Sequence, residues 1–252
     1  MTEQELLQAV LAAPDDDAPR AAFAALKEQE GDPRGRFIRM QLTLASLEAG
    51  APGISFLSTE TGELIEQHGA AWAASVAPLV SGYRFHRGFV AEVTLTARDF
   101  LAHAPRLFAA APIQHLNLRR VAGDAAALFA SPHLARIRSL ELNQCGLDDD
   151  VMRLLAASPH LGELRWLALV FNRVGLPGAE AIAASRGLPR LTYVDFAGNE
   201  VDPGRQHATD QGVVADSWLP EEGEYLDHKY GPLAWLHYEA KTMDDLPPSR
   251  YR

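Results

Sequence analysis

Three stretches of the chain decide the fold: IRSLELNQCGL at 137–147, LRWLALVFNRV at 164–174 and LTYVDFAGNEV at 191–201. Each stretch holds two apolar residues separated by one position, and three positions after the second of them stands Cys145, Asn172 or Asn199. Successive stretches begin 27 residues apart. A pattern that returns at a fixed interval predicts similar units stacked along the chain, because one such unit buries too little apolar surface alone.

Two earlier stretches extend the pattern, VAEVTLTA from Val90 and IQHLNLRRV from Ile113. Aligning all five gives the paired apolar positions Val93/Leu95, Leu116/Leu118, Leu140/Leu142, Leu167/Leu169 and Val194/Phe196. Runs compatible with helices lie between the stretches, and the whole pattern resembles the ribonuclease-inhibitor type of leucine-rich repeat. We therefore predict an α/β fold with a short leucine-rich-repeat solenoid over residues 88–204, in which a parallel curved sheet is backed by outer helices.

The first 87 residues predict a helical region in two parts. Residues 1–50 form a helical module, and residues 51–87 form a helical connector and N-terminal cap. The first helix has a capping box at Thr2 and is stopped by Pro14. A second helix, capped by Asp17, is expected to end at Gly31. The third is expected from Pro33 to Gly50 with an apolar stripe of Phe37, Met40, Leu44 and Leu47. A connector at 51–58 follows, and residues 59–80 predict either one helix or a pair of short helices divided at Gly69. Residues 205–252 are predicted to form an acidic C-terminal cap.

The N-terminal sequence is similar to the bacterial repeat-companion domain, a module that often precedes leucine-rich repeats. The residues that carry the resemblance are Pro19-Arg20, Gly31-Asp32-Pro33-Arg34-Gly35, Phe37-Ile38-Arg39, Gln41 and Arg84-Phe85 with Arg87-Gly88-Phe89. The similarity extends over residues 1–95, but Arg36 stands where the family usually has an acid. The resemblance implies an architecture and no particular activity.

Charge and composition narrow the classes of partner. The net charge is −10, and the acids are concentrated in the two ends of the chain. Since an acidic protein repels phosphate backbones, we expect no nucleic-acid partner. Cys145 is the single cysteine, and neither a signal peptide nor an apolar run of membrane-spanning length is evident. The expectation is a cytoplasmic protein without a membrane partner, whose oligomeric state the sequence does not indicate.

Catalytic and metal-binding motifs are absent from the sequence. It contains no G-x-S-x-G, no glycine-rich phosphate loop and no H-E-x-x-H, and its nine histidines have no metal-ligand spacing. We expect no enzyme activity, no cofactor and no metal. The acid triplets 15–17 and 148–150 are interpreted as helix caps, and Asn172 and Asn199 as structural residues. The turn at 31–35 is expected to connect two helices, with a docking role for Arg34, Arg36 and Arg39 as the alternative.

The outward residues of the five predicted strands form rows across the sheet, and these rows are the candidate binding site. Trp166 and Tyr193 occupy equivalent places on adjacent strands, and we expect an exposed aromatic pair there. The partner-binding candidates are Trp166, Tyr193, Asp195, Glu141, Arg119, His115, Asn117 and Asn143. The alternative is that the C-terminal segment folds back and covers the two aromatic residues.

The function that these patterns favour is that of a non-catalytic adaptor or scaffold, which binds a protein or peptide on its concave face. One alternative is an inhibitor or immunity-type protein whose acidic ends neutralise a basic partner. A second alternative is an enzyme or small-ligand sensor with a pocket between the N-terminal helices and the solenoid.

Overall fold

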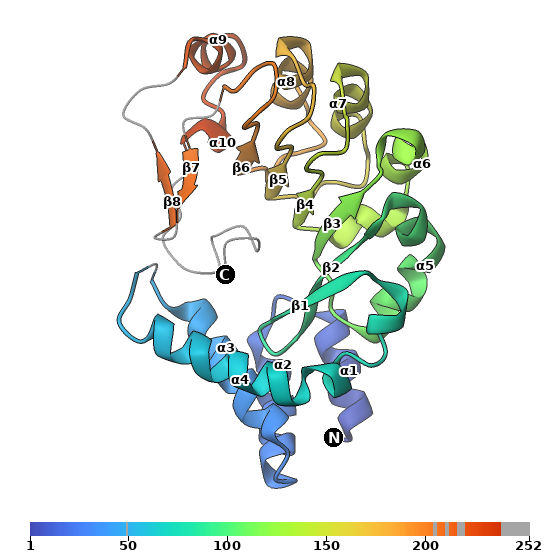
Figure 1. The fold of residues 1–252 in the computed structure, drawn as a ribbon, viewed down its shortest axis with the longest axis vertical. Helices are drawn as coiled ribbons and strands as arrows, with labels where there is room; N and C mark the ends of the chain where they lie inside the picture. The colour runs from blue at the N-terminus through green and yellow to red at the C-terminus, as the bar shows by residue number, and fades with distance from the viewer. Residues whose placement is uncertain (49, 204–205, 210–211, 216–219, 238–252) are drawn as a thin grey trace.

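The computed structural model describes residues 1–48, 50–203, 206–209, 212–215 and 220–237. Within these residues the protein has an α/β fold built on one six-stranded sheet of order β1-β2-β3-β4-β5-β6 (Figure 1). The strands of this sheet are β1 Gly82–His86, β2 Phe89–Thr96, β3 His115–Arg119, β4 Ser139–Glu141, β5 Trp166–Ala168 and β6 Tyr193–Asp195. β7 Gln206–Thr209 and β8 Gly212–Ala215 form a separate antiparallel pair.

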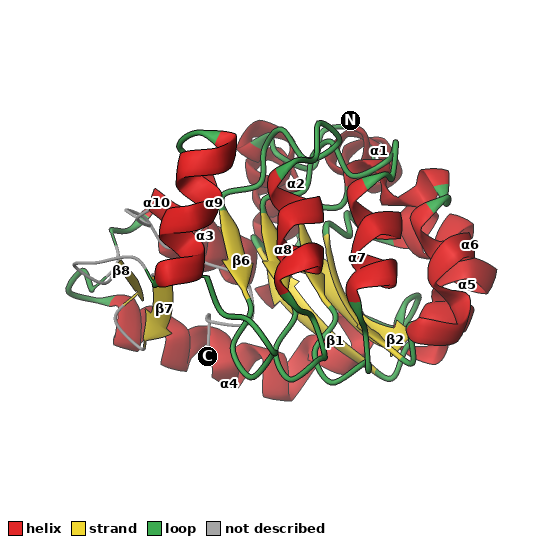
Figure 2. Cartoon of the chain, turned by 90° about the horizontal axis from the view of Figure 1, so that it is seen from above, coloured by secondary structure: helices red, strands yellow, loops and turns green. Residues whose placement is uncertain are grey.

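Helices cover one side of the sheet and extend beyond its first edge. The helices before the sheet are α1 Glu3–Ala12, α2 Asp17–Gln29, α3 Pro33–Ser46 and α4 Ile54–Trp72. The later helices are α5 Ala97–Ala110, α6 Ala125–Phe129, α7 Asp149–Ala156, α8 Leu176–Ala183, α9 Glu221–Tyr230 and α10 Ala234–His237. Short 3-10 turns lie at Ala77–Leu79, Ala122–Asp124 and Pro132–Arg136. Figures 1 and 2 show α5–α8 on the outer side of an arc of strands, and Figure 1 shows α1–α4 together at the end of the molecule that holds β1.

Strands β2 to β6 are parallel and keep one register throughout. Glu92 pairs with His115, His115 with Ser139, Ser139 with Trp166, and Trp166 with Tyr193. The predicted alignment of the five sequence stretches is therefore confirmed. The paired apolar residues of these stretches are all at most 2% exposed and belong to one continuous core shared with the outer helices.

The two asparagines at the ends of the later strands bond to the backbone, as the sequence predicted. Oδ1 of Asn172 accepts from the amides of Cys145 and Leu147, both at 3.0 Å. Nδ2 of Asn172 donates to the carbonyls of Leu142 (2.9 Å) and Leu169 (2.6 Å). Asn199 makes three of these four bonds one strand later, accepting from the amide of Val174 and donating to the carbonyls of Leu169 and Phe196. Each asparagine thus joins two successive turns of the chain where strand hydrogen bonding stops.

The structure corrects the expected boundaries before residue 88. β1 was not predicted, because residues 51–87 were expected to be wholly helical; it pairs antiparallel with β2. The helix α4 begins at Ile54, inside the expected connector, and continues through Gly69 without a break. In α2 the capping residue is Asp16 rather than Asp17. In α3, which ends at Ser46, the buried stripe consists of Gly35, Phe37, Ile38, Gln41 and Ala45, because this helix faces both α2 and the β1–β2 hairpin.

The hairpin between β1 and β2 joins the N-terminal helices to the sheet. Its two-residue turn, Arg87-Gly88, has positive φ at both positions (51° and 86°), as a tight hairpin turn requires. A Cβ at Gly88 would lie 2.4–2.9 Å from Ile38 of α3, and the Gly88 amide donates to Oε1 of Gln41 at 2.7 Å. The close approach of the turn to α3 therefore requires glycine at this position.

Candidate functional site

The register of the sheet places one row of side chains on the face opposite the buried leucines. This first row contains Glu92, His115, Ser139, Trp166 and Tyr193. Side chains alternate between the two faces of a strand, and the leucines between these positions pack against the outer helices. The first row therefore lies on the inner side of the arc in Figure 1.

Three of the aromatic side chains in and beside this row contact one another. The rings of His86 and His115 have centroids 5.8 Å apart, and those of His115 and Trp166 are 6.0 Å apart. Strands β3 and β5 are separated by β4, so their backbones are roughly 9.6 Å apart. The small Ser139 side chain on β4 leaves room for the Trp166 ring to reach His115. We call His86, His115, Trp166 and Tyr193 the ring strip.

The expectation of an exposed aromatic pair is wrong. Trp166 is 4% exposed and Tyr193 is 3% exposed. A strand pattern identifies the face that a side chain occupies, but it does not tell what lies over that face. The alternative was that the C-terminal segment covers these two residues. Much of that segment lies outside the described part of the chain, namely residues 204–205, 210–211, 216–219 and 238–252. A role for the two residues in partner binding stays a prediction.

The remaining candidate residues lie one or two rows further along the strands. Asn117 Nδ2 donates to Glu141 Oε2 at 3.0 Å. The Tyr193 hydroxyl donates to Asp195 Oδ2 at 3.2 Å, which joins the second row to the ring strip. Asn143 is occupied by a structural bond, since its Oδ1 accepts from the amide of Val170 at 2.8 Å. Arg119 lies exposed at the end of β3.

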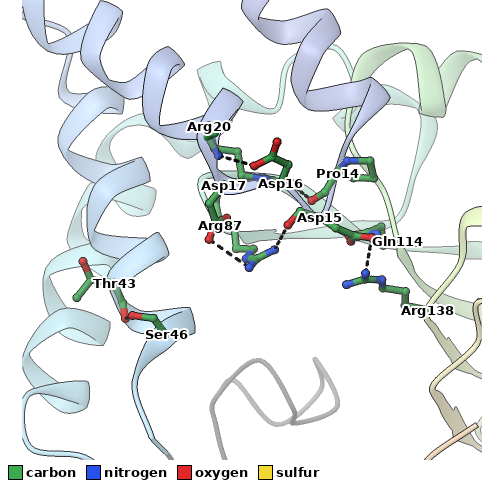
Figure 3. Close-up of polar contacts among 11 residues, drawn as sticks. Pro14, Asp15, Asp16, Asp17, Arg20, Thr43, Ser46, Arg87, Gln114 and Arg138 are labelled. Atoms are coloured by element: carbon green, nitrogen blue, oxygen red, sulfur yellow. Dashed lines mark hydrogen bonds and ion pairs between the residues drawn. The ribbon is translucent and has the colours of Figure 1, made fainter. Parts of the chain in front are cut away.

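Three arginines that the sequence did not mark as site residues meet beside the first row. Arg20 donates to the carbonyls of Arg87 and Pro14, both at 2.9 Å. Arg87 donates to the carbonyl of Asp15 at 3.3 Å, while Arg138 forms an ion pair with the Asp15 carboxylate (Figure 3). Their sites in the sequence are far apart, and only the fold unites them. Arg20 and Arg87 belong to the motifs that carry the family resemblance, and only this resemblance could have drawn attention to them in the sequence.

We call Arg20, Arg87 and Arg138 the arginine edge. Two aspartates at the start of α2 hold it in place. The second Asp15 carboxylate oxygen accepts from Gln114 Nε2 at 2.8 Å, and Asp17 lies 3.3 Å from Arg87. Residues 15–17 were expected to act as helix caps. Asp16 does cap α2, whereas Asp15 and Asp17 also contact the arginine edge.

The two histidines of the ring strip are held in the neutral form. Burial, together with the positive charges of Arg87, Arg20 and Arg138, lowers the pKa of His86 to about 3. Burial, His86 and two of the same arginines lower the pKa of His115 well below its usual value. His115 Nδ1 is also buried without a hydrogen-bond partner among the described residues.

The arginines of the 31–35 turn and of α3 each contact other side chains of the protein, and their alternative docking role stays a prediction. Arg34 lies over the rings of Phe23 and Phe89 at 5.2 and 5.1 Å. Arg36 pairs with Glu60, and Arg39 pairs with Glu28. The turn joins α2 and α3 with Asp32 as the capping residue, as predicted.

The other polar features of the sheet end are structural. Asp148 caps α7, and Asp149 Oδ1 accepts from the amides of Gly175 (2.8 Å) and Gly178 (3.0 Å) at the start of α8. Burial raises the pKa of the Cys145 thiol, which donates to the carbonyl of Leu118 at 3.3 Å. Among the described residues, no group of three or more His, Cys, Asp or Glu side chains is placed to hold a metal ion.

Comparison with known proteins adds no identification. No family model matches this chain, and no curated protein matches it. Within the described ranges, none of the helices combines the length and apolar character needed to span a membrane.

Proposed function

We propose that this chain is a non-catalytic adaptor that binds a protein or peptide on the inner face of a short leucine-rich-repeat solenoid over residues 88–204. In this proposal the helices before residue 88 and the segment after residue 204 cap the two ends of the solenoid. Four parallel strand pairings in one register support the repeat interpretation. The equivalent bonds of Asn172 and Asn199 support it as well.

The observation that carries the binding function is the ring strip. Four rings stand in or beside one row of the sheet face that the outer helices leave uncovered. Large aromatic side chains bring much contact area at a small loss of conformational freedom, and tryptophan and tyrosine are enriched at the centres of protein interfaces. Trp166 and Tyr193 are paired on adjacent strands, so in this proposal both belong to one binding site.

The experiment is a selection of peptides from a phage-displayed random library on the immobilised full-length protein, followed by measurement of Kd for the synthesised peptides. We expect Trp166→Ala and Tyr193→Ala each to weaken binding by about 30-fold, or roughly 2 kcal/mol. Phe56→Ala removes an aromatic residue that is 64% exposed on α4 and serves as the matched control, with binding unchanged.

Thermal unfolding of the same variants separates binding from folding. Trp166 is buried, so its removal also lowers Tm. The binding measurements are therefore made well below the Tm of each variant. If Trp166→Ala remains folded and binds every selected peptide with the wild-type Kd, the ring strip is only a packing element and the proposed function is wrong.

A further inference from the structure

Positive charge is concentrated at the edge of the sheet where the chain passes from the outer helices into the strands. The connecting segments are residues 111–114, 130–138, 157–165 and 184–192, and all of them are described. Their charged residues are five arginines and one glutamate, namely Arg136, Arg138, Arg165, Arg186, Arg190 and Glu163. The connections at the opposite edge, residues 120–124, 142–148 and 169–175, hold two arginines and two aspartates. The excess of arginine is thus specific to one of these two edges, in a chain whose net charge is −10.

We call Arg136, Arg165, Arg186 and Arg190 the basic rim. Arg190 pairs with Glu163, which is the one side-chain hydrogen bond of the rim within the described ranges, and the Arg136 guanidinium lies 5.1 Å from the ring centroid of Phe108. Arg186 is exposed and Arg165 is half-buried, and neither has an acidic partner among the described residues. The negative ends of α6, α7 and α8 favour arginine at this edge. Because the guanidinium groups of Arg165 and Arg186 bond to no helix carbonyl there, they remain able to hold a carboxylate of another molecule.

The protein itself shows how a carboxylate binds at this edge. The amide of Arg138 donates to the carbonyl of Gln114, and the amide of Arg165 donates to the carbonyl of Arg138, both at 2.8 Å, so the three residues occupy successive equivalent positions. The Asp15 carboxylate, from the turn between α1 and α2, contacts the first two positions: it accepts from Gln114 at 2.8 Å and pairs with Arg138 (Figure 3). Arg165 stands at the third position without such a contact.

We propose that the basic rim binds an acidic segment of a partner protein, which continues along the edge from the place where the contacts of Asp15 end. One carboxylate of the segment pairs with Arg165, and others pair with Arg186 and Arg190. Glu163 competes for Arg190 and so limits the affinity. This inference goes beyond the proposed function, because it concerns the edge of the sheet and not its inner face.

An acidic protein segment fits this edge better than a nucleic acid does. The acidic turn between α1 and α2 lies at one end of the rim, and Glu163 lies within it. A nucleic acid carries a phosphate at every nucleotide, so a strand that follows the edge would meet these acids, and the net charge of −10 repels it as well. A peptide can place carboxylates at the arginines and neutral residues elsewhere.

The test measures the fluorescence anisotropy of a labelled short peptide of alternating Asp and Ser residues, titrated with the full-length protein. We expect the peptide to bind, to bind less tightly as the salt concentration rises, and to bind far less tightly when Asn replaces each Asp. These measurements use the wild-type protein, so they do not depend on how a variant folds.

A pair of double variants locates the binding. Arg165→Gln combined with Arg186→Gln should weaken binding about ten-fold. Neither change leaves an acid of the described residues without its partner, so we expect the variant to remain folded, and thermal unfolding checks this. The matched control is Arg98→Gln combined with Arg120→Gln, which removes two exposed arginines from the opposite edge and should leave Kd unchanged.

A gain of affinity gives a second, independent readout. Glu163→Gln releases Arg190 from its partner and should tighten binding about three-fold. Asp124→Asn removes a carboxylate paired with Arg98 at the opposite edge, and it should leave Kd unchanged although it alters the net charge equally. A tighter complex cannot result from a loss of folded protein.

The outcomes separate this inference from the proposed function. Absence of peptide binding, or equal Kd values for the rim double variant and its control, would overturn the inference. An oligothymidylate of similar length that binds more tightly than the peptide and is weakened by the same variants would overturn it too, in favour of a nucleic-acid partner. The proposed function depends on Trp166, which none of these variants changes, and its own test decides it.

Discussion

At the residue scale, the most consequential polar side chain is Asn172. Its amide satisfies two backbone donors and two carbonyls in adjoining turns of the chain. We expect Asn172→Ala to lower the free energy of unfolding by about 3 kcal/mol, because it leaves several buried backbone groups without partners. Urea denaturation measures this, with Gln67→Ala, an exposed amide on α4, as the control. A loss equal to that of the control would show that the bonds are dispensable.

The two buried histidines predict a pH dependence of stability. In the unfolded chain each has a pKa near 6.5, while in the folded protein the pKa of His86 is about 3 and that of His115 is also lowered. Below pH 6.5 the unfolded state therefore binds protons that the folded state does not. Stability is unaffected above this pH and falls as the pH drops towards 3, by about 1.4 kcal/mol per pH unit for each histidine.

The variant His115→Phe tests this dependence. Phenylalanine keeps a ring beside Trp166 but cannot be protonated, so the fall in unfolding free energy between pH 7 and pH 5 should be smaller than in the wild type. Urea denaturation at the two pH values gives the comparison. If the free energy of unfolding fell equally in the variant and the wild type, His115 would have the same pKa in the folded and the unfolded protein.

At the scale of elements, the hairpin turn between β1 and β2 controls how the N-terminal helices meet the sheet. Gly88→Ala places a Cβ against Ile38, including its backbone, at a φ that alanine rarely adopts. We expect a loss of about 3 kcal/mol in unfolding free energy. Gly123→Ala, at a glycine with open space around it, should change stability little. Equal unfolding midpoints for the two variants would contradict the close approach.

How far the sequence predicts the elements depends on the range of the interactions. The register of β2 to β6 was predictable, because the paired apolar positions return at intervals of 23, 24, 27 and 27 residues. The positions of Cys145, Asn172 and Asn199 add a second marker in the last three stretches. The strand β1 was not, because its residues alternate weakly and its pairing is decided by the Arg87-Gly88 turn and by α3. The buried stripe of α3 was predicted wrongly for a similar reason. It packs against α2 and the β1–β2 hairpin, which are not part of the repeating pattern.

At the scale of the whole molecule, the candidate site combines parts that the sequence shows with parts that it hides. The row containing His115, Trp166 and Tyr193 follows from strand alternation. The meeting of Arg20, Arg87 and Arg138 depends on how the N-terminal helices are placed against the sheet. Contacts between segments this far apart leave no periodic trace in a single sequence.

The attachment of the N-terminal helices to the sheet is therefore a feature that mutation can probe. Asp15 bonds to both Gln114 and Arg138, which lie just before β3 and β4. We expect Asp15→Ala to raise hydrogen exchange in α1 and α2 while leaving exchange in β4–β6 unchanged, because contact with the sheet is lost locally. Asp150→Ala, which removes an exposed carboxylate paired within α7, is the control. Uniform exchange changes across the molecule would argue against a local attachment.

Fluorine NMR of the full-length protein labelled with 5-fluorotryptophan tests the central claim most directly. The resonance of Trp166, assigned from Trp166→Phe, should shift on titration with a selected peptide, while those of Trp72 and Trp235 stay in place. Trp72 on α4 packs against Phe37, and Trp235 packs against Phe196 in the core shared with the outer helices. Peptide binding that leaves the Trp166 resonance unmoved would contradict a binding site on the inner face of the sheet.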